Sequence, residues 1–249
     1  PKPQDSFQSV QDLNQEALRS YAAADFQKAL RVWNAALAKA PDSSKIQYNL
    51  GLTHFALQDF NRSVDAFSQA MKGDELTSPA LVNRALALTQ IGEYTRARQD
   101  LQQAAKLSPQ DPLVRFNLGL LAHRQGETTQ AIQHYTEALD IRPQMAPALN
   151  NRGICYLETK QYRKADSDFT QAIRIQDDNA SYYFNRAIAR EEGSRFDDAV
   201  SDYTTAVNLQ PNMAPAFYNR GLLRINMNRK QLGCQDLKQA CELGMCEQL

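Results

Sequence analysis

The apolar residues of segment 10–24 recur at helical spacing. Leu13, Ala17 and Tyr21 stand at positions i, i+4 and i+8, which places them on one face of a helix, and the other face carries Gln, Asn, Glu and Arg side chains. A second stretch suited to a helix runs from 26 to 39 and contains the single tryptophan of the chain. The pattern predicts two helices joined by a short turn.

This two-helix pattern returns every 34 residues. A small residue recurs in the first helix of each unit at Ala17, Gly51, Ala85, Gly119, Gly153, Ala187 and Gly221. A second small series lies in the second helix at Ala29, Ser63, Ala97, Ala131, Ala165, Ala199 and Gly233. Four residues later a large apolar residue follows, at Trp33, Phe67, Leu101, Tyr135, Phe169, Tyr203 and Leu237, and alanine recurs at Ala36, Ala70, Ala104, Ala138, Ala172, Ala206 and Ala240. A fixed period of this length indicates a repeat solenoid, in which each hairpin buries its apolar side against its neighbours.

The order of small residue, alanine, aromatic, alanine and closing proline resembles the tetratricopeptide repeat (TPR). Prolines close four units at Pro41, Pro109, Pro143 and Pro211. Counted from Val10, the units are 10–43, 44–77, 78–111, 112–145, 146–179, 180–213 and 214–247. The resemblance implies an all-α fold, a right-handed superhelix of seven helix-turn-helix repeats, with residues 1–9 as a lead-in and 10–249 as one domain. It extends to bacterial TPR proteins, including those of cyanobacteria that help assemble membrane complexes.

Charge and hydropathy exclude several classes of partner. Lys and Arg together number 28, as do Asp and Glu, so the basic excess typical of nucleic-acid binding is absent. No apolar run approaches the roughly 18 residues that a membrane helix needs. Because the sequence begins at Pro1 rather than Met, we expect any membrane attachment to depend on a removed N-terminal segment. The compartment stays open between the cytoplasm and an exported or membrane-tethered location.

Nothing in the sequence predicts catalysis. The three histidines, His54, His123 and His134, occupy different positions of their units, and no phosphate-binding loop or metal-ligand cluster is recognisable. We therefore expect no enzyme activity, no cofactor, no bound metal and no small-molecule substrate.

The four cysteines divide into two pairs. Cys155 and Cys234 stand where most other units have Ala, Leu, Ile or Val, and we expect both in the core. Cys241 and Cys246 can form a disulfide in an oxidising compartment. A zinc site there is disfavoured, because no histidine is near in sequence and no paired CxxC occurs.

Two positions of the unit vary together. The seventh position is Glu16, Leu50, Arg84, Leu118, Arg152, Arg186 and Arg220, and the twenty-third is Val32, Ala66, Asp100, His134, Asp168, Asp202 and Asp236. The four units with Arg at the seventh position are the four with Asp at the twenty-third. This predicts a structural Arg–Asp bridge between the two helices of each of these hairpins.

The sixth position holds asparagine in six successive units, at Asn49, Asn83, Asn117, Asn151, Asn185 and Asn219. Asparagine is a mediocre helix former, so six of them in mid-helix need a reason. One interpretation is that each amide bonds the neighbouring hairpin's backbone and holds the stack together. The other is a ladder that binds the backbone of an extended peptide, because an amide offers both a donor and an acceptor. The TPR resemblance implies the second, with the ladder on the concave face, and both roles can coexist.

Residues flanking the ladder are expected to select side chains of the peptide. They come from the fifth and twelfth positions and their neighbours: Tyr48, Phe116, Phe184, Tyr218, Phe55, His123 and Arg124. The chaperone-type carboxylate clamp of some TPR proteins is missing, because the ninth position is aliphatic throughout and the fifth holds no lysine.

The expected function is therefore that of a monomeric adaptor or assembly factor that holds a protein or peptide partner in the concave groove. The alternative is a self-associating scaffold that docks through its convex face or its last hairpin. The sequence leaves the partner, the pathway and the oligomeric state open.

Overall fold

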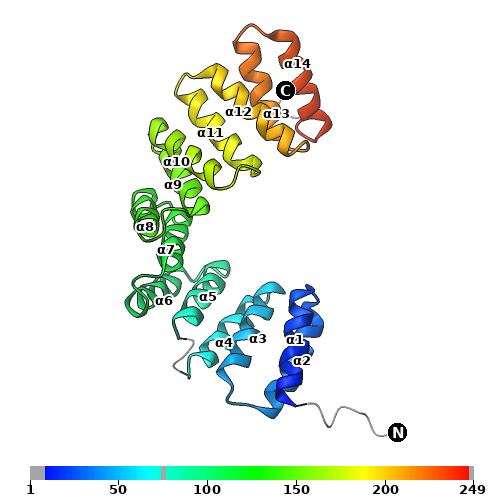
Figure 1. Cartoon of the computed structure of the whole chain (residues 1–249), viewed down its shortest axis with the longest axis vertical. Coiled ribbons are helices and arrows are strands. Elements are labelled where there is room, and N and C mark those ends of the chain that lie inside the picture. Colours follow the sequence, from blue (N-terminus) through cyan, green and yellow to red (C-terminus); the bar gives the residue numbers. More distant parts are fainter. Residues whose placement is uncertain (1–8, 74–76, 247–249) are drawn as a thin grey trace, which may run out of the picture. The chain divides into compact units, whose positions relative to one another are not determined.

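The computed structural model describes residues 9–73 and 77–246, and these residues form fourteen α-helices and no strand (Figure 1). The first seven are α1 (Val10–Ala22), α2 (Phe26–Lys39), α3 (Ser44–Ala56), α4 (Phe60–Ala70), α5 (Thr77–Gln90), α6 (Tyr94–Leu107) and α7 (Pro112–Arg124). The other seven are α8 (Thr128–Ile141), α9 (Ala146–Glu158), α10 (Tyr162–Ile175), α11 (Ala180–Glu192), α12 (Phe196–Leu209), α13 (Ala214–Asn226) and α14 (Lys230–Glu242). The all-α prediction is confirmed.

The helices group into two compact units, of which the first ends at Leu121 and the second begins at Ala122, within α7. In the first unit α1 pairs with α2, α3 with α4 and α5 with α6, and α2 and α4 also pack on the hairpin that follows. The second unit repeats this plan, with the pairs α9–α10, α11–α12 and α13–α14 linked by contacts between α8 and α9, α10 and α11, and α12 and α13. The superhelical handedness and the single domain stay predictions.

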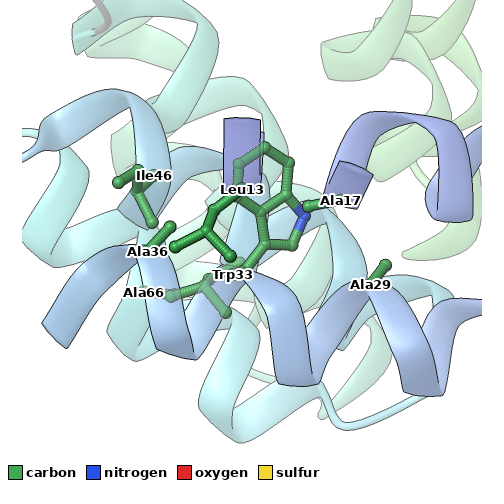
Figure 2. Packing of buried hydrophobic residues seen from close by; sticks show 8 residues of the cluster. Leu13, Ala17, Ala29, Trp33, Ala36, Ile46 and Ala66 are labelled. Carbon is green, nitrogen blue, oxygen red and sulfur yellow. The ribbon is translucent and has the colours of Figure 1, made fainter. Parts of the chain in front are cut away.

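Several core clusters contain the large residue of a second helix, such as Trp33, Phe67 or Phe169. Trp33 of α2 is almost fully buried, and it packs with Leu13 and Ala17 of α1 and with Ile46 of the next hairpin (Figure 2). Small residues of the paired helix make room for such side chains. A Cβ atom added to Gly153 of α9 would lie only 2.7 Å from Cε1 of Phe169 in α10, so glycine is needed there for the helices to approach.

The turn inside every hairpin has the same conformation. Its central residue has φ between 57° and 82° at Ala24, Gln58, Gly92, Gly126, Lys160, Ser194 and Asn228, all at the fifteenth position of the unit. Glycine adopts this left-handed region freely, whereas residues with a Cβ atom do so at a cost. Five of the seven turns therefore hold a residue that is strained there.

The turn glycines give a first testable prediction. Gly126→Ala should lower the free energy of unfolding by about 0.5–1 kcal/mol, because a Cβ atom at Gly126 meets no neighbour within 4 Å and only the backbone conformation opposes it. Ala24→Gly, at the equivalent turn, should raise stability by a similar amount. Urea unfolding of both variants measures the two effects. Changes of the same sign would contradict the argument.

The cysteines behave in two ways. Cys155 is fully buried, as predicted, whereas the prediction that Cys234 lies in the core is wrong, because Cys234 is exposed. Its counterpart Val200 is covered by Ala216 and Leu223 of the following hairpin, but no described helix follows α14 to cover Cys234. Cys241 and Cys246 form a disulfide.

The helices of the described chain are all too short or too polar to cross a bilayer.

Candidate functional site

The asparagines of the sixth position lie in the middle of the first helices α3, α5, α7, α9, α11 and α13. In the first unit, the Asn83 amide nitrogen donates to the Tyr48 hydroxyl of the preceding hairpin at 2.8 Å and to the Pro79 carbonyl at 3.0 Å. Asn117 is buried, and its amide nitrogen donates to the Leu113 carbonyl at 2.9 Å. Asn49 is half-buried and forms no side-chain hydrogen bond with any described residue.

The second unit uses its asparagines in a related way. The Asn185 amide nitrogen donates to Oδ1 of Asn150 in the preceding hairpin at 2.9 Å, and that of Asn219 donates to the Tyr203 hydroxyl at 3.4 Å. Oδ1 of Asn151 accepts from the Asn150 amide nitrogen of the same helix at 3.2 Å. The amides of Asn83, Asn185 and Asn219 thus connect consecutive hairpins, through side chains rather than through the backbone.

This arrangement leaves a chemical asymmetry in the half-buried amides. In Asn83, Asn185 and Asn219 the nitrogen donates within the protein, while Oδ1 accepts no hydrogen bond from any other described residue. A carbonyl oxygen of this kind can accept a hydrogen bond from a ligand, such as a peptide N–H group.

The aromatic residues beside the asparagines are half-buried and pack on the cores of their own hairpins. Tyr48 lies edge-on to Phe67 with ring centroids 5.6 Å apart, and burial raises the pKa of its hydroxyl. Phe184 packs against Tyr203 at 5.8 Å. Phe116 and Tyr218 are half-buried as well. These side chains therefore contribute to packing and present only part of their surface to a ligand.

The peptide-contact residues predicted at the twelfth position and next to it differ in their burial and in their partners. Phe55 is half-buried and packs edge-on to Phe60, with centroids 5.3 Å apart. Nε2 of His123 lies 2.7 Å from Oε1 of Glu158 in the next hairpin, and Arg124 is exposed. The structure thus brings His123 to Glu158.

The predicted Arg–Asp bridges are confirmed in all four hairpins. Arg152 donates from Nε and Nη2 to the two carboxylate oxygens of Asp168, each at 2.8 Å. The equivalent pairs are Arg84–Asp100, Arg186–Asp202 and Arg220–Asp236, with distances between 2.6 and 3.0 Å. Bidentate pairing of buried groups gives these arginines a structural role.

A third partner of each arginine escaped the sequence analysis. Nη1 donates to a hydroxyl of the preceding hairpin in the pairs Arg84–Ser68, Arg152–Thr136, Arg186–Thr170 and Arg220–Thr204, at 2.9–3.1 Å. The two units with Leu in place of Arg follow hairpins that have Asn34 or Gln102 at the hydroxyl position. A hydroxyl residue in one hairpin therefore varies together with the arginine of the next hairpin, and the sequence alone contains this relation.

A pocket of about 600 Å³ opens in the second unit between the start of α10 and the end of α11. Its lining is Lys160, Gln161, Tyr162, Arg163, Lys164, Asp166, Ala189, Arg190, Gly193 and Arg195. Arg190 and Arg195 both donate to Asp166 at 2.8 Å, but Lys160 and Arg163 form no ion pair with a described residue. None of the predicted peptide-binding residues lines this pocket, whose excess of cations suits an anionic group.

Comparison with known families decides the assignment of the chain. One sequence model of the tetratricopeptide repeat matches residues 14–75 and 82–146, and a second matches residues 122–190. This chain belongs to the tetratricopeptide repeat family. A search of curated proteins finds no significant match.

Solved structures of other TPR proteins share the fold. The C-terminal part of a TPR repeat-containing protein from Cytophaga hutchinsonii superposes with a TM-score of 0.73 at 17% identity, covering 93% of this chain and 95% of that part. MamA from Desulfovibrio magneticus RS-1 (residues 41 to the end) gives 0.64 at 19% identity, over 69% of this chain and 96% of MamA. YrrB, described as a TPR protein with an unusual peptide-binding site, gives 0.63 at 18% identity, over 73% and 93%.

These comparisons establish an all-α TPR solenoid and indicate a role in protein–protein interaction. Both matching sequence models describe repeats, and neither is a catalytic family. The mode of interaction depends on the residues described above.

Proposed function

We propose that this TPR chain binds an extended segment of a partner protein along its first helices, as an adaptor or assembly factor. The observation that carries the proposal is the unfilled Oδ1 acceptor of Asn83, Asn185 and Asn219, whose amide nitrogens are held by the protein. In the second unit Asn185 and Asn219 lie on consecutive hairpins, and fixed acceptors in such a row are complementary to the N–H groups of an extended chain. In this proposal the amide nitrogen bonds the neighbouring hairpin and the amide oxygen bonds the peptide. Each asparagine therefore has both the stacking role and the binding role.

Each unit contributes its own set of residues. In the first unit we assign the backbone contacts to Asn49, Asn83 and Asn117 and the side-chain contacts to Tyr48, Phe55 and Phe116. In the second unit, backbone contacts fall to Asn151, Asn185 and Asn219, and side-chain contacts to His123, Arg124, Phe184 and Tyr218. Because the aromatic rings are already half-buried, they add limited apolar contact, and the amides determine binding.

The test is a comparison of two double variants of the full chain. A peptide is first selected on the immobilised wild-type protein from a displayed random library, and its affinity is then measured by fluorescence anisotropy. The double variant Asn185→Ala/Asn219→Ala should bind it about tenfold more weakly, since each lost hydrogen bond contributes about 0.5–1.5 kcal/mol. The double variant Asn208→Ala/Asn226→Ala removes two exposed amides outside the ladder and should bind like the wild type.

Circular dichroism at rising temperature controls for the fold, because Asn185 also bonds Asn150. A folded ladder variant with wild-type affinity would contradict the proposal. The asparagines would then serve the stack alone, and the binding surface would lie on the convex face or the last hairpin.

A further inference from the structure

Three potential metal ligands converge in the second unit. His123 lies near the end of α7, and Cys155 and Glu158 lie one turn apart on α9. Their donor atoms, one from each side chain, all lie within 4.8 Å of one another. Cys155 is fully buried and His123 half-buried, whereas 44% of the Glu158 side chain is exposed. The cluster therefore has a buried thiol end and an open carboxylate end.

The repeats themselves show that this convergence departs from the packing pattern. At the position of Cys155, the other units have Arg19, Thr53, Ala87, Leu121, Ala189 and Leu223. At the position of His123, they have Tyr21, Phe55, Thr89, Leu157, Glu191 and Ile225. Most of these residues are aliphatic or aromatic, so packing does not require cysteine or histidine at either place. A ligand-type residue at all three places occurs only where α7 precedes α9.

The chemistry of the three donor atoms indicates which metal ions they can bind. A thiolate, an imidazole and a carboxylate form the mixed sulfur, nitrogen and oxygen set that zinc accepts, and three protein ligands leave a fourth position for water or a further group. Ligand atoms in a tetrahedral zinc site lie about 3.3–3.8 Å apart. The His123–Glu158 contact of 2.7 Å would need to widen by about 1 Å or less, which a side-chain rotation of the exposed Glu158 can supply.

The surroundings support the same assignment. The Thr128 hydroxyl donates to Oε2 of Glu158 at 3.1 Å and so orients the carboxylate with Oε1 towards His123. A divalent cation that binds here displaces the proton of the Cys155 thiol, which leaves to solvent as the sulfur–metal bond forms.

We propose that His123, Cys155 and Glu158 bind one divalent zinc-type ion, which joins α7 to α9. No short sequence motif predicts this site, because His123 and Glu158 are 35 residues apart and belong to different hairpins. The ion would tie consecutive hairpins by bonds that the unfolded chain lacks, so its binding stabilises the stack. This site shares His123 with the peptide contacts proposed above, but it uses none of the asparagines.

Cobalt(II) provides the probe, because its absorption reports the ligands. The full chain is freed of metal with a chelator and kept without reductant, so that the Cys241–Cys246 disulfide stays closed. Titration should reach saturation at one equivalent, with a thiolate-to-cobalt band in the near ultraviolet and tetrahedral bands in the visible. Added zinc should abolish these bands by displacement and raise the melting temperature.

Variants assign the bands to the proposed ligands. Cys155→Ala should abolish the thiolate band, and its fold is expected to survive because Ala87 and Ala189 occupy the same position in other hairpins. His123→Leu, which copies Leu157, should weaken cobalt binding by at least about tenfold. Cys234→Ala removes the exposed free thiol and should change nothing.

Three results would overturn the proposal. One is the absence of a thiolate band in the wild type at one equivalent. Another is loss of the band in Cys234→Ala with retention in Cys155→Ala. The third is equal cobalt affinity in the wild type, Cys155→Ala and His123→Leu, which would mean adventitious binding to surface carboxylates.

Discussion

Phe169→Ala should lower the free energy of unfolding by about 3–5 kcal/mol. The Phe169 ring is fully buried, and it packs against Ala189 of the next hairpin as well as over Gly153 of its own. Truncation therefore opens a cavity that touches two hairpins, and the glycine beneath the ring has no side chain with which to fill it. Urea unfolding followed by circular dichroism measures the loss. Phe196→Ala is the matched control, because Phe196 is exposed and its loss should cost little.

A double-mutant cycle shows whether the loss comes from this contact. Gly153→Ala alone should cost about 1–3 kcal/mol, because its Cβ atom would lie 2.7 Å from the ring. The combination Gly153→Ala/Phe169→Leu should cost less than the sum of its single changes, since hairpin α5–α6 already pairs Ala85 with Leu101. Additive costs would mean that the ring does not pack on Gly153.

Arg152→Leu should also cost about 3–5 kcal/mol, because it leaves a buried carboxylate without its counter-charge. Asp168 is only 3% exposed, and both its oxygens accept from Arg152. Hydrogen bonds and the charge of Asp168 raise the pKa of the Arg152 guanidinium, against the effect of burial, so the pair stays charged. The change also removes the bond to Thr136 of the preceding hairpin. Urea unfolding measures the loss.

Two comparisons separate the stranded charge from lost packing. In the double variant Arg152→Leu/Asp168→Ala, which copies Leu50 and Ala66 of α3 and α4, most of the stability should return. Arg186→Leu should cost less than Arg152→Leu, because Asp202 keeps a hydrogen bond of 2.7 Å from Arg190. Equal stability of the Arg152 single and double variants would contradict the argument.

Seven copies of one unit made much of this structure predictable. Helix formation depends on the spacing of apolar residues within a helix, and the Arg–Asp bridge joins positions that lie 16 residues apart in one hairpin. Both relations fall within a single 34-residue unit, so each recurs in several repeats and can be recognised by comparing them. The hydroxyl partner of each arginine, such as Thr136, obeys the same rule across the unit boundary and could have been found in the same way.

The positions of the asparagines in the candidate site were predictable, but the hydrogen bonds of their amide atoms were predictable only in part. The sequence placed asparagines at equivalent positions of six first helices, but it did not reveal which atoms the protein itself would use. That choice depends on neighbouring side chains that vary between hairpins, Tyr48 for Asn83 and Asn150 for Asn185. The aromatic residues are likewise drawn into packing by partners such as Phe67 and Tyr203.

By itself, the sequence determined the all-α repeat fold, the paired helices and the Arg–Asp bridges, because these follow from short-range spacing that recurs in every unit. Only the tertiary structure decided the features that depend on stacking. Cys234 is exposed because no described helix covers α14, and His123 meets Cys155 and Glu158 because α9 follows α7 in the stack. The basic pocket between α10 and α11 arises in the same way. The burial of a side chain, and its meeting with distant residues, depend on which side chains surround it in space. A repeat pattern predicts those surroundings only at positions where all the repeats have similar residues.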